Sequence, residues 1–366
     1  MDKVKILIVL TGLTDNDGVS NFVKTIFELI NHQVFQIDFA TYKEIDSNAE
    51  IIKIIRSMNL KTNIYNLSTF NNIFHITKLK QIISNYDIIH INLLSRALPL
   101  MMVARYLNKK VILHSHSAVI GVSFISKLRN ILCLPLLKKC TTSFAACSKG
   151  AGNLLFPENK FKVINNSIKS ALFKFDNIRR KKMRAFHAIN DTTFVIGIVA
   201  RIYNIKNPFF CIDIIKEILK KYNNVEFWWI GDGPMKNELQ QYIKDNKMEQ
   251  KVKLFGTRAD TIDFYCAFDL FLLPSQSEGL GISVIEAQAT GLPCIVSTGV
   301  PCIVDYSHLV QFLSLDIPAK YWADCIINIM NNPSVRRSYE KELVESPFYD
   351  IGNVRELEKY YLEIAK

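Results

Sequence analysis

Residues 270 to 297 read LFLLPSQSEGLGISVIEAQATGLPCIVS and contain two apolar runs separated by a short helix. The run LFLLP is apolar without alternation, as in a strand that is buried on both faces. The helix that follows has its apolar residues spaced to pack under a sheet, and Gly291 and Pro293 end it. The run PCIVS then gives a second buried strand. This order of strand, helix and strand predicts a parallel sheet covered by helices.

The same alternation extends through most of the chain. Apolar runs with helical segments between them occur at 5–10, 36–42, 87–92, 111–116 and 143–148, and again at 194–200, 225–231, 252–256, 270–274 and 293–297. A polar and basic segment, 170–191, separates the two series. We therefore predict an α/β fold with two doubly wound domains, 1–168 and 169–346. Ligands are expected in a cleft between them, at the carboxyl ends of both sheets.

Composition narrows the class of protein. The chain has 366 residues, of which 49% are hydrophobic, and its 45 Lys and Arg exceed its 34 Asp and Glu by eleven. The hydrophobic share is typical of a globular protein. The excess of positive charge favours anionic partners such as nucleotides, nucleic acid or acidic lipid headgroups. The eight cysteines are scattered without a CxxC pair, which indicates buried thiols in a reducing compartment and argues against zinc ribbons.

No segment reads as a secretion signal or a membrane span. The N-terminal stretch MDKVKILIVLTGL has a short apolar run that ends in a Thr-Gly turn, so we interpret it as a buried strand. The most apolar later stretch, 93–107, is interrupted by Arg96 and Arg105 and is shorter than the roughly 20 residues needed to span a bilayer. We expect a cytoplasmic protein that at most visits the inner face of the cell membrane.

Two cations follow the strand FVIGIVA. Arg201 and Lys206 come just after its carboxyl end, where doubly wound folds bind ligands, and together they would suit a diphosphate. A solvated loop is the alternative interpretation. After the next strand, Gly231 opens the turn GDGP, whose backbone could approach an anion, although many strand-to-helix turns share that sequence.

Glu278 and Glu286 flank the start of the helix in the opening stretch. The amides of about Leu280, Gly281 and Ile282 are free to meet a phosphate oxygen, which would repel a carboxylate aimed at the same point. The two glutamates are therefore expected to accept hydrogen bonds from hydroxyls, one from a sugar and one from a ribose. This pattern predicts a nucleotide sugar. A capping glutamate plus a solvated one is the alternative.

The first domain offers Gly18, at the entry to a helix, and the histidines of VILHSH. His114 and His116 are spaced to point to the same side of a strand. No carboxylate or cysteine accompanies them at metal-ligand spacing, so zinc is not expected. A histidine at the strand end could bind a sugar hydroxyl or phosphate, or its ring nitrogens could form hydrogen bonds only within the fold.

Two basic segments are candidate surfaces for a membrane or for nucleic acid. Segment 123–140 mixes apolar residues with Lys127, Arg129, Lys138 and Lys139, which could lie on an anionic membrane; a core helix with a solvated basic face is the alternative. Segment 178–184 reads as a solvated face. No motif supports nucleic-acid binding.

Together these motifs resemble the retaining GT-B glycosyltransferases of family 4, especially the bacterial exopolysaccharide and capsule members. The resemblance rests on GLG-x3-IEAQATGLPCIVS with Glu278 and Glu286, AR-x4-KN with Arg201 and Lys206, GDGP and FGTRAD, and upstream on HSHS, ACSKGAGNLLF and VINNSI. It covers almost the whole chain in the family's order. This sequence departs from the family's pattern at two positions: Asp17 replaces one of two paired glycines, and Ser167 replaces a glycine.

The resemblance implies two Rossmann-like domains facing across a cleft, with a terminal helix, 347–366, that returns to the first domain. It implies transfer from a nucleoside diphosphate sugar with retention of configuration and without a metal ion or other cofactor. The implied role of Arg201 and Lys206 is to clamp the diphosphate, and that of Glu286 is to bind the ribose. Glu278, with the amides of Gly279 to Ile282, is implied to contact the sugar and phosphate. His116 is implied to lie near the reaction centre. Gly18 matches the paired-glycine loop, and Arg258 the loop near the base or phosphates.

The subfamily likeness favours a UDP-hexose or UDP-N-acetylhexosamine donor and a lipid-linked saccharide acceptor. Two other functions stay open: a non-catalytic nucleotide-sugar-binding subunit, and a nucleotide-sugar epimerase on a similar fold. A dinucleotide dehydrogenase is disfavoured, because no G-x-G-x-x-G follows the first strand.

Overall fold

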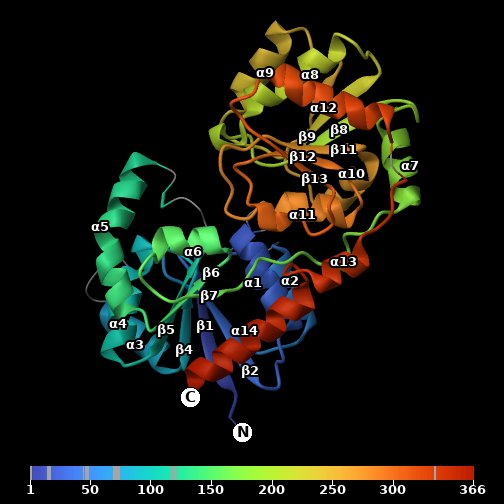
Figure 1. Cartoon of the computed structure of the whole chain (residues 1–366). Helices are drawn as coiled ribbons and strands as arrows, with labels where there is room; N and C mark the ends of the chain where they lie inside the picture. Colours follow the sequence, from blue (N-terminus) through green and yellow to red (C-terminus); the bar gives the residue numbers. More distant parts are fainter. Residues whose placement is uncertain are drawn as a thin grey trace. The chain divides into compact units, whose positions relative to one another are not determined.

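The computed structural model describes residues 2–14, 18–43, 45, 49–68, 75–116, 120–121, 123–333 and 335–366. The chain divides into two compact units, which we treat separately. Unit 1 comprises Met1–Ser167 and Asp350–Lys366, and unit 2 comprises Ile168–Tyr349. Figure 1 shows a sheet flanked by helices in each.

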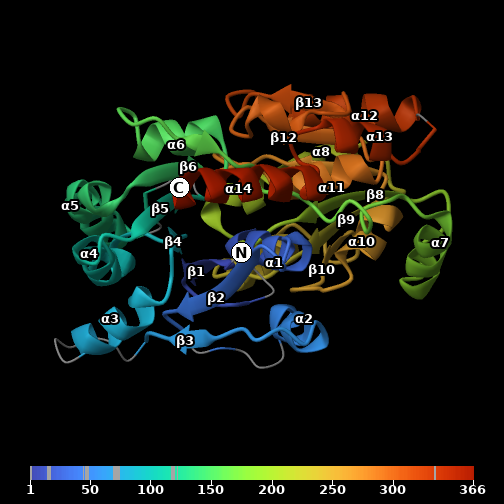
Figure 2. The same cartoon turned by 90° about the horizontal axis from the view of Figure 1, so that it is seen from below.

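Unit 1 contains a parallel sheet in the order β3-β2-β1-β4-β5-β6-β7. Its strands are β1 (Val4–Leu10), β2 (Phe35–Thr41), β3 (Ile64–Asn66), β4 (Ile88–Ile91), β5 (Lys110–Ser115), β6 (Ser143–Ala146) and β7 (Lys162–Val163). Its helices are α1 (Gly18–Leu29), α2 (Glu50–Ser57), α3 (Ile76–Ser84), η2 (Ser95–Ala97), α4 (Leu98–Tyr106), α5 (Phe124–Cys140), α6 (Lys149–Leu155) and α14 (Asp350–Ala365). The strand order reverses between β1 and β4, and Figure 2 shows β3 beyond β2 on one side of β1.

Alternation along β1 explains why helices cover both faces of this sheet. Ile6, Ile8 and Leu10 pack into one apolar cluster with α1, α2 and α14, whereas Leu7 and Val9 pack into another with α3 and α4. All five side chains are at most 1% exposed. Helix α14 contributes Val354, Leu357 and Tyr361 to the first cluster, so the chain's last segment is part of the core of unit 1.

Unit 2 repeats the arrangement with a parallel sheet in the order β10-β9-β8-β11-β12-β13. Its strands are β8 (Phe194–Val199), β9 (Val225–Ile230), β10 (Val252–Leu254), β11 (Leu270–Leu273), β12 (Cys294–Ser297) and β13 (Val310–Leu313). Its helices are α7 (Asn177–Phe186), η3 (Asn204–Lys206), α8 (Pro208–Leu219), α9 (Lys236–Asp245), α10 (Thr261–Ala267), α11 (Ile282–Ala289), η4 (Cys302–Val304), α12 (Ala319–Asn331) and α13 (Glu340–Glu345). The order reverses between β8 and β11.

The predicted class, α/β with two doubly wound parallel sheets, is confirmed. All eight cysteines are free, and five of them are buried. Among the helices of the described ranges, none is both long and apolar enough to cross a bilayer.

Candidate functional site

The loops after β8 and β11 lie together at the switch point of unit 2. The backbone amide of Gln276 donates to the carbonyl of Ile205 over 2.7 Å, which ties one loop to the other. Asn207 has a left-handed backbone, with φ of 55°, and Pro208 then begins α8. Since strand carboxyl ends at a switch point are where doubly wound sheets bind ligands, the residues of these two loops form the candidate site of unit 2.

Lys206 and Glu278 meet across these loops. Lys206 Nζ donates to Glu278 Oε1, and the two side chains are only 20% and 10% exposed. Sequence reasoning placed these residues at one site but assigned them different ligand groups. The ion pair shows that each is the other's partner in this structure, so an anion that binds Lys206 has to compete with the carboxylate.

Arg201 follows β8 directly, and its side chain is exposed. Within the described ranges it has no ion-pair or hydrogen-bond partner. A guanidinium in this position keeps its donors available for the paired oxygens of a phosphate.

The start of α11 is shaped by Gly281, which has φ of 85° and precedes the first helical residue, Ile282. A side chain there would be strained and would lie 3.2 Å from Val300. Leu280 is 4% exposed and anchors the turn in the core of unit 2. The amides in the first turn of a helix have no acceptor inside it, so this turn presents N–H groups beside Glu278.

Glu286 lies further along α11 and is half-buried. Tyr265 donates a hydrogen bond of 2.7 Å from its hydroxyl to Glu286 Oε2. Burial raises the pKa of Glu286 to about 7, although the Tyr265 hydrogen bond opposes this shift. The carboxyl group can therefore change its charge near neutral pH.

Two predicted donor residues have intramolecular roles. Gly231 follows β9 with φ of 134°, and a Cβ there would come within 2.1 Å of the Ala200 carbonyl oxygen. Its amide donates to the carbonyl of Gly256 over 2.7 Å. Arg258 is held by Asp260 through two hydrogen bonds, Nε to Oδ1 at 2.8 Å and Nη2 to Oδ2 at 2.7 Å. Backbone packing alone explains why residue 231 is glycine, and the guanidinium of Arg258 is already paired with the carboxylate of Asp260.

In unit 1, His116 follows β5 and lies near Asn92, which follows β4. His116 Nε2 is 2.7 Å from Asn92 Oδ1. The amide nitrogen of Asn92 points to the carbonyl oxygens of Val9 and His90, each at 3.4 Å, so its oxygen must face the histidine. This orientation makes Nε2 of His116 the protonated nitrogen that donates to Asn92. The expected common side of His114 and His116 is observed, with ring centroids 4.0 Å apart.

Asn92 was missed as a site residue in the sequence, although it stands at the end of the predicted strand 87–92. The signal was available: a polar residue directly after a buried strand lies at the ligand-binding edge of a parallel sheet.

Gly18 is the exposed first residue of α1. Nearby, Ser20 Oγ donates to the carbonyl of Gly12 over 3.1 Å and so ties α1 to the end of β1. The expected departure at Asp17 lies outside the described residues.

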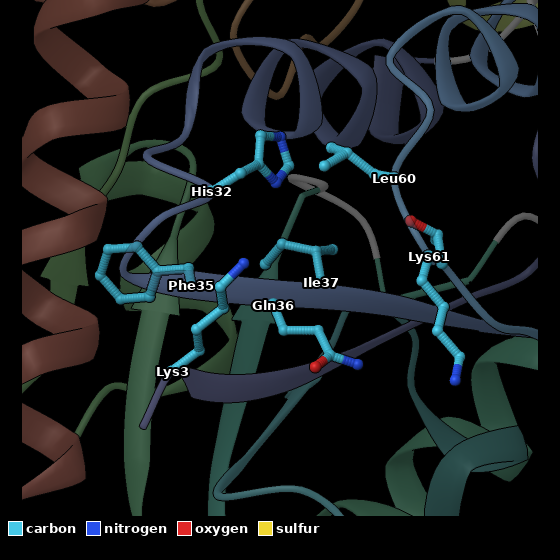
Figure 3. Close-up of a pocket in the computed structure, with 8 residues that line it drawn as sticks. Lys3, His32, Phe35, Gln36, Ile37, Leu60 and Lys61 are labelled. Atoms are coloured by element: carbon cyan, nitrogen blue, oxygen red, sulfur yellow. The ribbon is translucent and has the colours of Figure 1, made fainter. Parts of the chain in front are cut away.

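A hollow in unit 1 is unrelated to this site. It lies at the amino ends of β1 and β2, opposite the edge with His116, and is lined by Lys3, His32, Phe35, Gln36, Ile37, Leu60, Lys61 and Thr62 (Figure 3). His32 Nε2 is 2.7 Å from the carbonyl of Phe27, so its ring is held by the fold. Among residues with described positions, no group of three His, Cys, Asp or Glu side chains is placed to hold a metal ion.

Comparison with known proteins identifies relatives of both the sequence and the fold. Residues 193–332 match the family model of the glycosyl transferases group 1. The chain is 25% identical to EpsF of Bacillus subtilis (strain 168), assigned as a glycosyltransferase, over 94% of this chain and 93% of that protein. It is 26% identical to the UDP-Gal:alpha-D-GlcNAc-diphosphoundecaprenol alpha-1,3-galactosyltransferase of Escherichia coli, over 76% of each.

The crystal structure of Anabaena HepE in complex with UDP and glucose superposes with a TM-score of 0.81 at 16% identity, covering 98% of this chain and 99% of that one. The two-domain Rossmann-like fold expected of a GT-B protein is therefore confirmed.

Proposed function

We propose, from the premise that residues 193–332 form a glycosyl transferases group 1 domain, that the chain transfers a hexose or N-acetylhexosamine from a UDP-sugar to a saccharide acceptor, with retention of configuration. The E. coli relative is named for a UDP-galactose donor and a diphosphoundecaprenol-linked acceptor, and HepE was crystallised with UDP and glucose. These names support a UDP-sugar donor and a lipid-linked acceptor of capsule or exopolysaccharide synthesis.

The observation that carries the proposal is the arrangement of Arg201, Lys206 and Glu278 at the switch point of unit 2. In this role Arg201 and Lys206 bind the diphosphate together with the amides at the start of α11. When Lys206 pairs with the diphosphate and no longer with Glu278, the Glu278 carboxylate can accept hydrogen bonds from the sugar. Glu286, held by Tyr265, accepts from the ribose hydroxyls.

For the chemical step we propose attack on the face that the diphosphate leaves. The acceptor oxygen forms its bond to the anomeric carbon as the bond from that carbon to the phosphate oxygen breaks. The acceptor proton passes to the departing phosphate. Arg201, Lys206 and the α11 amides stabilise the negative charge that develops on the diphosphate, so the protein's own cations suffice in this proposal and no metal is required. His116, oriented by Asn92, hydrogen-bonds the sugar or phosphate near the reacting carbon.

A membrane-facing role for α5 fits an acceptor carried by lipid. Phe124, Ile125 and Leu132 are 81%, 76% and 68% exposed, and Leu128 and Leu136 continue the stripe at four-residue spacing. In Figure 1 this helix lies at one side of unit 1. The other side of the same helix packs into the core of unit 1 through Leu137 and Cys140. Exposed basic residues on the same helix, Lys127, Arg129 and Lys139, complement an anionic bilayer. We propose that α5 docks the protein on the inner face of the cell membrane.

Vesicle sedimentation tests this docking. Vesicles that contain phosphatidylglycerol should retain the wild-type protein, and pure phosphatidylcholine vesicles should not. Leu132→Ser combined with Phe124→Ser should abolish retention, whereas Phe186→Ser should not, although Phe186 is 80% exposed on the basic helix α7. Equal retention of both variants would refute a role for α5.

The donor is tested by thermal unfolding in the presence of UDP, GDP, dTDP, ADP and NAD at matched concentrations, because a ligand of the native state raises its stability. We expect UDP to give the largest rise in Tm and Arg201→Ala to remove it. Stabilisation by NAD alone would overturn the proposal. A product assay with UDP-sugars then separates transfer from the other two functions, since an epimerase converts donor without acceptor and a binding subunit converts nothing.

A further inference from the structure

Two fully buried histidines in unit 1 have no place in the proposed chemistry. His90 lies in β4 and is 0% exposed, and His114 lies in β5 and is 2% exposed. A buried imidazole costs more than an aliphatic side chain of similar size unless its nitrogens are hydrogen-bonded. These two histidines belong to a chain of hydrogen bonds between side chains.

This hydrogen-bond chain begins on α14 and ends beside His116. The hydroxyl of Tyr361 is 2.7 Å from His90 Nδ1, and His90 Nε2 is 3.1 Å from His114 Nδ1. The ring of His114 lies 4.0 Å from the ring of His116, centroid to centroid. Phe22 of α1 packs against both of these rings at 5.1 Å. A residue near the C-terminus is thus connected to the candidate site through three ring contacts.

The direction of the chain follows from protonation. Burial raises the pKa of Tyr361, lowers the pKa of His90 to about 3 and lowers the pKa of His114 well below its usual value, so the hydroxyl stays protonated and both imidazoles stay neutral. A neutral imidazole has one donor and one acceptor nitrogen. His90 Nδ1 is the one partner that the described residues give to the Tyr361 hydroxyl.

Tyr361 therefore donates to His90 Nδ1, His90 donates from Nε2 to His114 Nδ1, and the proton of His114 lies on Nε2. Either direction leaves one buried hydrogen without an acceptor among the described residues: the phenol hydrogen in the opposite case, and the Nε2 hydrogen of His114 in this one. A phenol hydroxyl is a stronger donor, and a neutral imidazole nitrogen a stronger acceptor, than the reverse pair, which favours donation from Tyr361.

We propose that Tyr361, His90 and His114 are positioning residues that fix the tautomer of His114 beneath His116 and thereby hold the His116 ring in place. Two constraints then act on His116: the hydrogen bond to Asn92 at its edge, and the His114 ring against its face. The arrangement also makes the geometry of His116 depend on the docking of α14. The functional meaning rests on the proposed role of His116, but the tautomers can be measured without any turnover.

The test is nitrogen-15 NMR of the full chain labelled at histidine, in wild type, Tyr361→Phe and Tyr360→Phe. Tyr360 is a matched control, since it lies next to Tyr361 on α14, and its hydroxyl donates to the carbonyl of Phe144 over 3.1 Å, outside the chain of histidines. Both substitutions remove one hydroxyl and keep the ring.

In wild type we expect His90, His114 and His116 each to carry the proton on Nε2. In Tyr361→Phe the single-tautomer signals of His90 and His114 should be lost and the His116 signal should shift. Tyr360→Phe should match wild type. The proposal is overturned if wild-type His114 carries its proton on Nδ1, if Tyr361→Phe leaves all three signals unchanged, or if both variants change them equally. His90→Phe breaks the chain one link closer and should give the same change at His114, which keeps the test available if Tyr361→Phe does not fold.

Discussion

Unit 1 and unit 2 both place their candidate residues at the carboxyl edge of a doubly wound parallel sheet but use different chemistry there. In unit 1, the loops after β4 and β5 carry Asn92 and His116, above two histidines that burial keeps neutral. In unit 2, the loops after β8 and β11 carry Arg201, Lys206 and Glu278, all of them charged groups. The fold thus fixes where a site lies, and the side chains decide what it holds.

The difference fits two kinds of ligand. Cations and helix amides suit a diphosphate, which keeps its charge, whereas neutral donors and acceptors suit sugar hydroxyls. Substitution of one candidate residue in each unit tests this assignment of ligands to units. Further substitutions distinguish structural from ligand-binding roles.

The largest effect is expected for Lys206→Ala. It removes a cation that we propose stabilises the departing diphosphate, so turnover of the UDP-sugar donor should fall by about 10²- to 10³-fold. Initial rates of UDP release measure this. Lys236→Ala is the control, because Lys236 is paired with Asp232 at 2.7 Å in a neighbouring loop, and it should lose little. Similar losses in both variants would show that general surface charge, and not a clamp, supports turnover.

His116→Phe is expected to lower turnover by about 10²-fold, because it removes the polar group that we propose lies beside the reacting carbon and retains an aromatic ring. The same assay measures it. His32→Phe, at the opposite end of the unit 1 sheet, should stay near wild type. An active His116→Phe variant would remove unit 1 from the chemistry as we describe it.

Gly231→Ala separates a structural glycine from a ligand-binding one. Because the added Cβ would meet the Ala200 carbonyl oxygen at 2.1 Å with φ at 134°, the free energy of unfolding should fall by about 2–4 kcal/mol. Denaturant titration measures the loss. Gly150→Ala is the control, since the nearest atom to its Cβ would be Ser148 Oγ at 3.9 Å. A stable Gly231→Ala protein with weakened UDP binding would return this glycine to the donor site.

Glu286 should make donor binding depend on pH. With its pKa raised to about 7, the carboxylate forms as pH rises from 6 to 8, and affinity for UDP-glucose should increase by up to about tenfold. Since the folded pKa is raised, its contribution to stability has the opposite sign and decreases as pH rises from the unfolded value toward 7. Calorimetric titration at several pH values measures the affinity. Glu286→Gln should flatten the profile, and an unchanged slope would assign the pH dependence elsewhere.

The smallest effect is expected for Glu278→Gln. It removes the carboxylate that pairs with Lys206, so UDP should bind about fivefold more tightly while turnover of the UDP-sugar falls. Glu226→Gln, which frees Lys253 from a pair at 2.9 Å, provides the control. Weaker UDP binding in Glu278→Gln would mean that Glu278 does not compete with the diphosphate.

The central strands and the charged residues of unit 2 could be predicted from the sequence, because buried parallel strands are continuous apolar runs and the cations follow them directly. Strands β3, β7 and β13 were not predicted. Each lies at an edge of its sheet and is only partly buried, so its sequence lacks that apolar signal. The partner of His90 was missed for another reason: Tyr361 is far from His90 in sequence, and only the fold brings them together.

The most direct test of the division between the two units is calorimetric titration of UDP into the wild-type protein, Lys206→Ala and His116→Phe. We predict that Lys206→Ala loses at least about tenfold in affinity, equivalent to about 1.4 kcal/mol, whereas His116→Phe binds UDP as wild type does. Equal loss in both variants, or loss in His116→Phe alone, would contradict the claim that unit 2 holds the diphosphate and unit 1 the neutral side of the reaction.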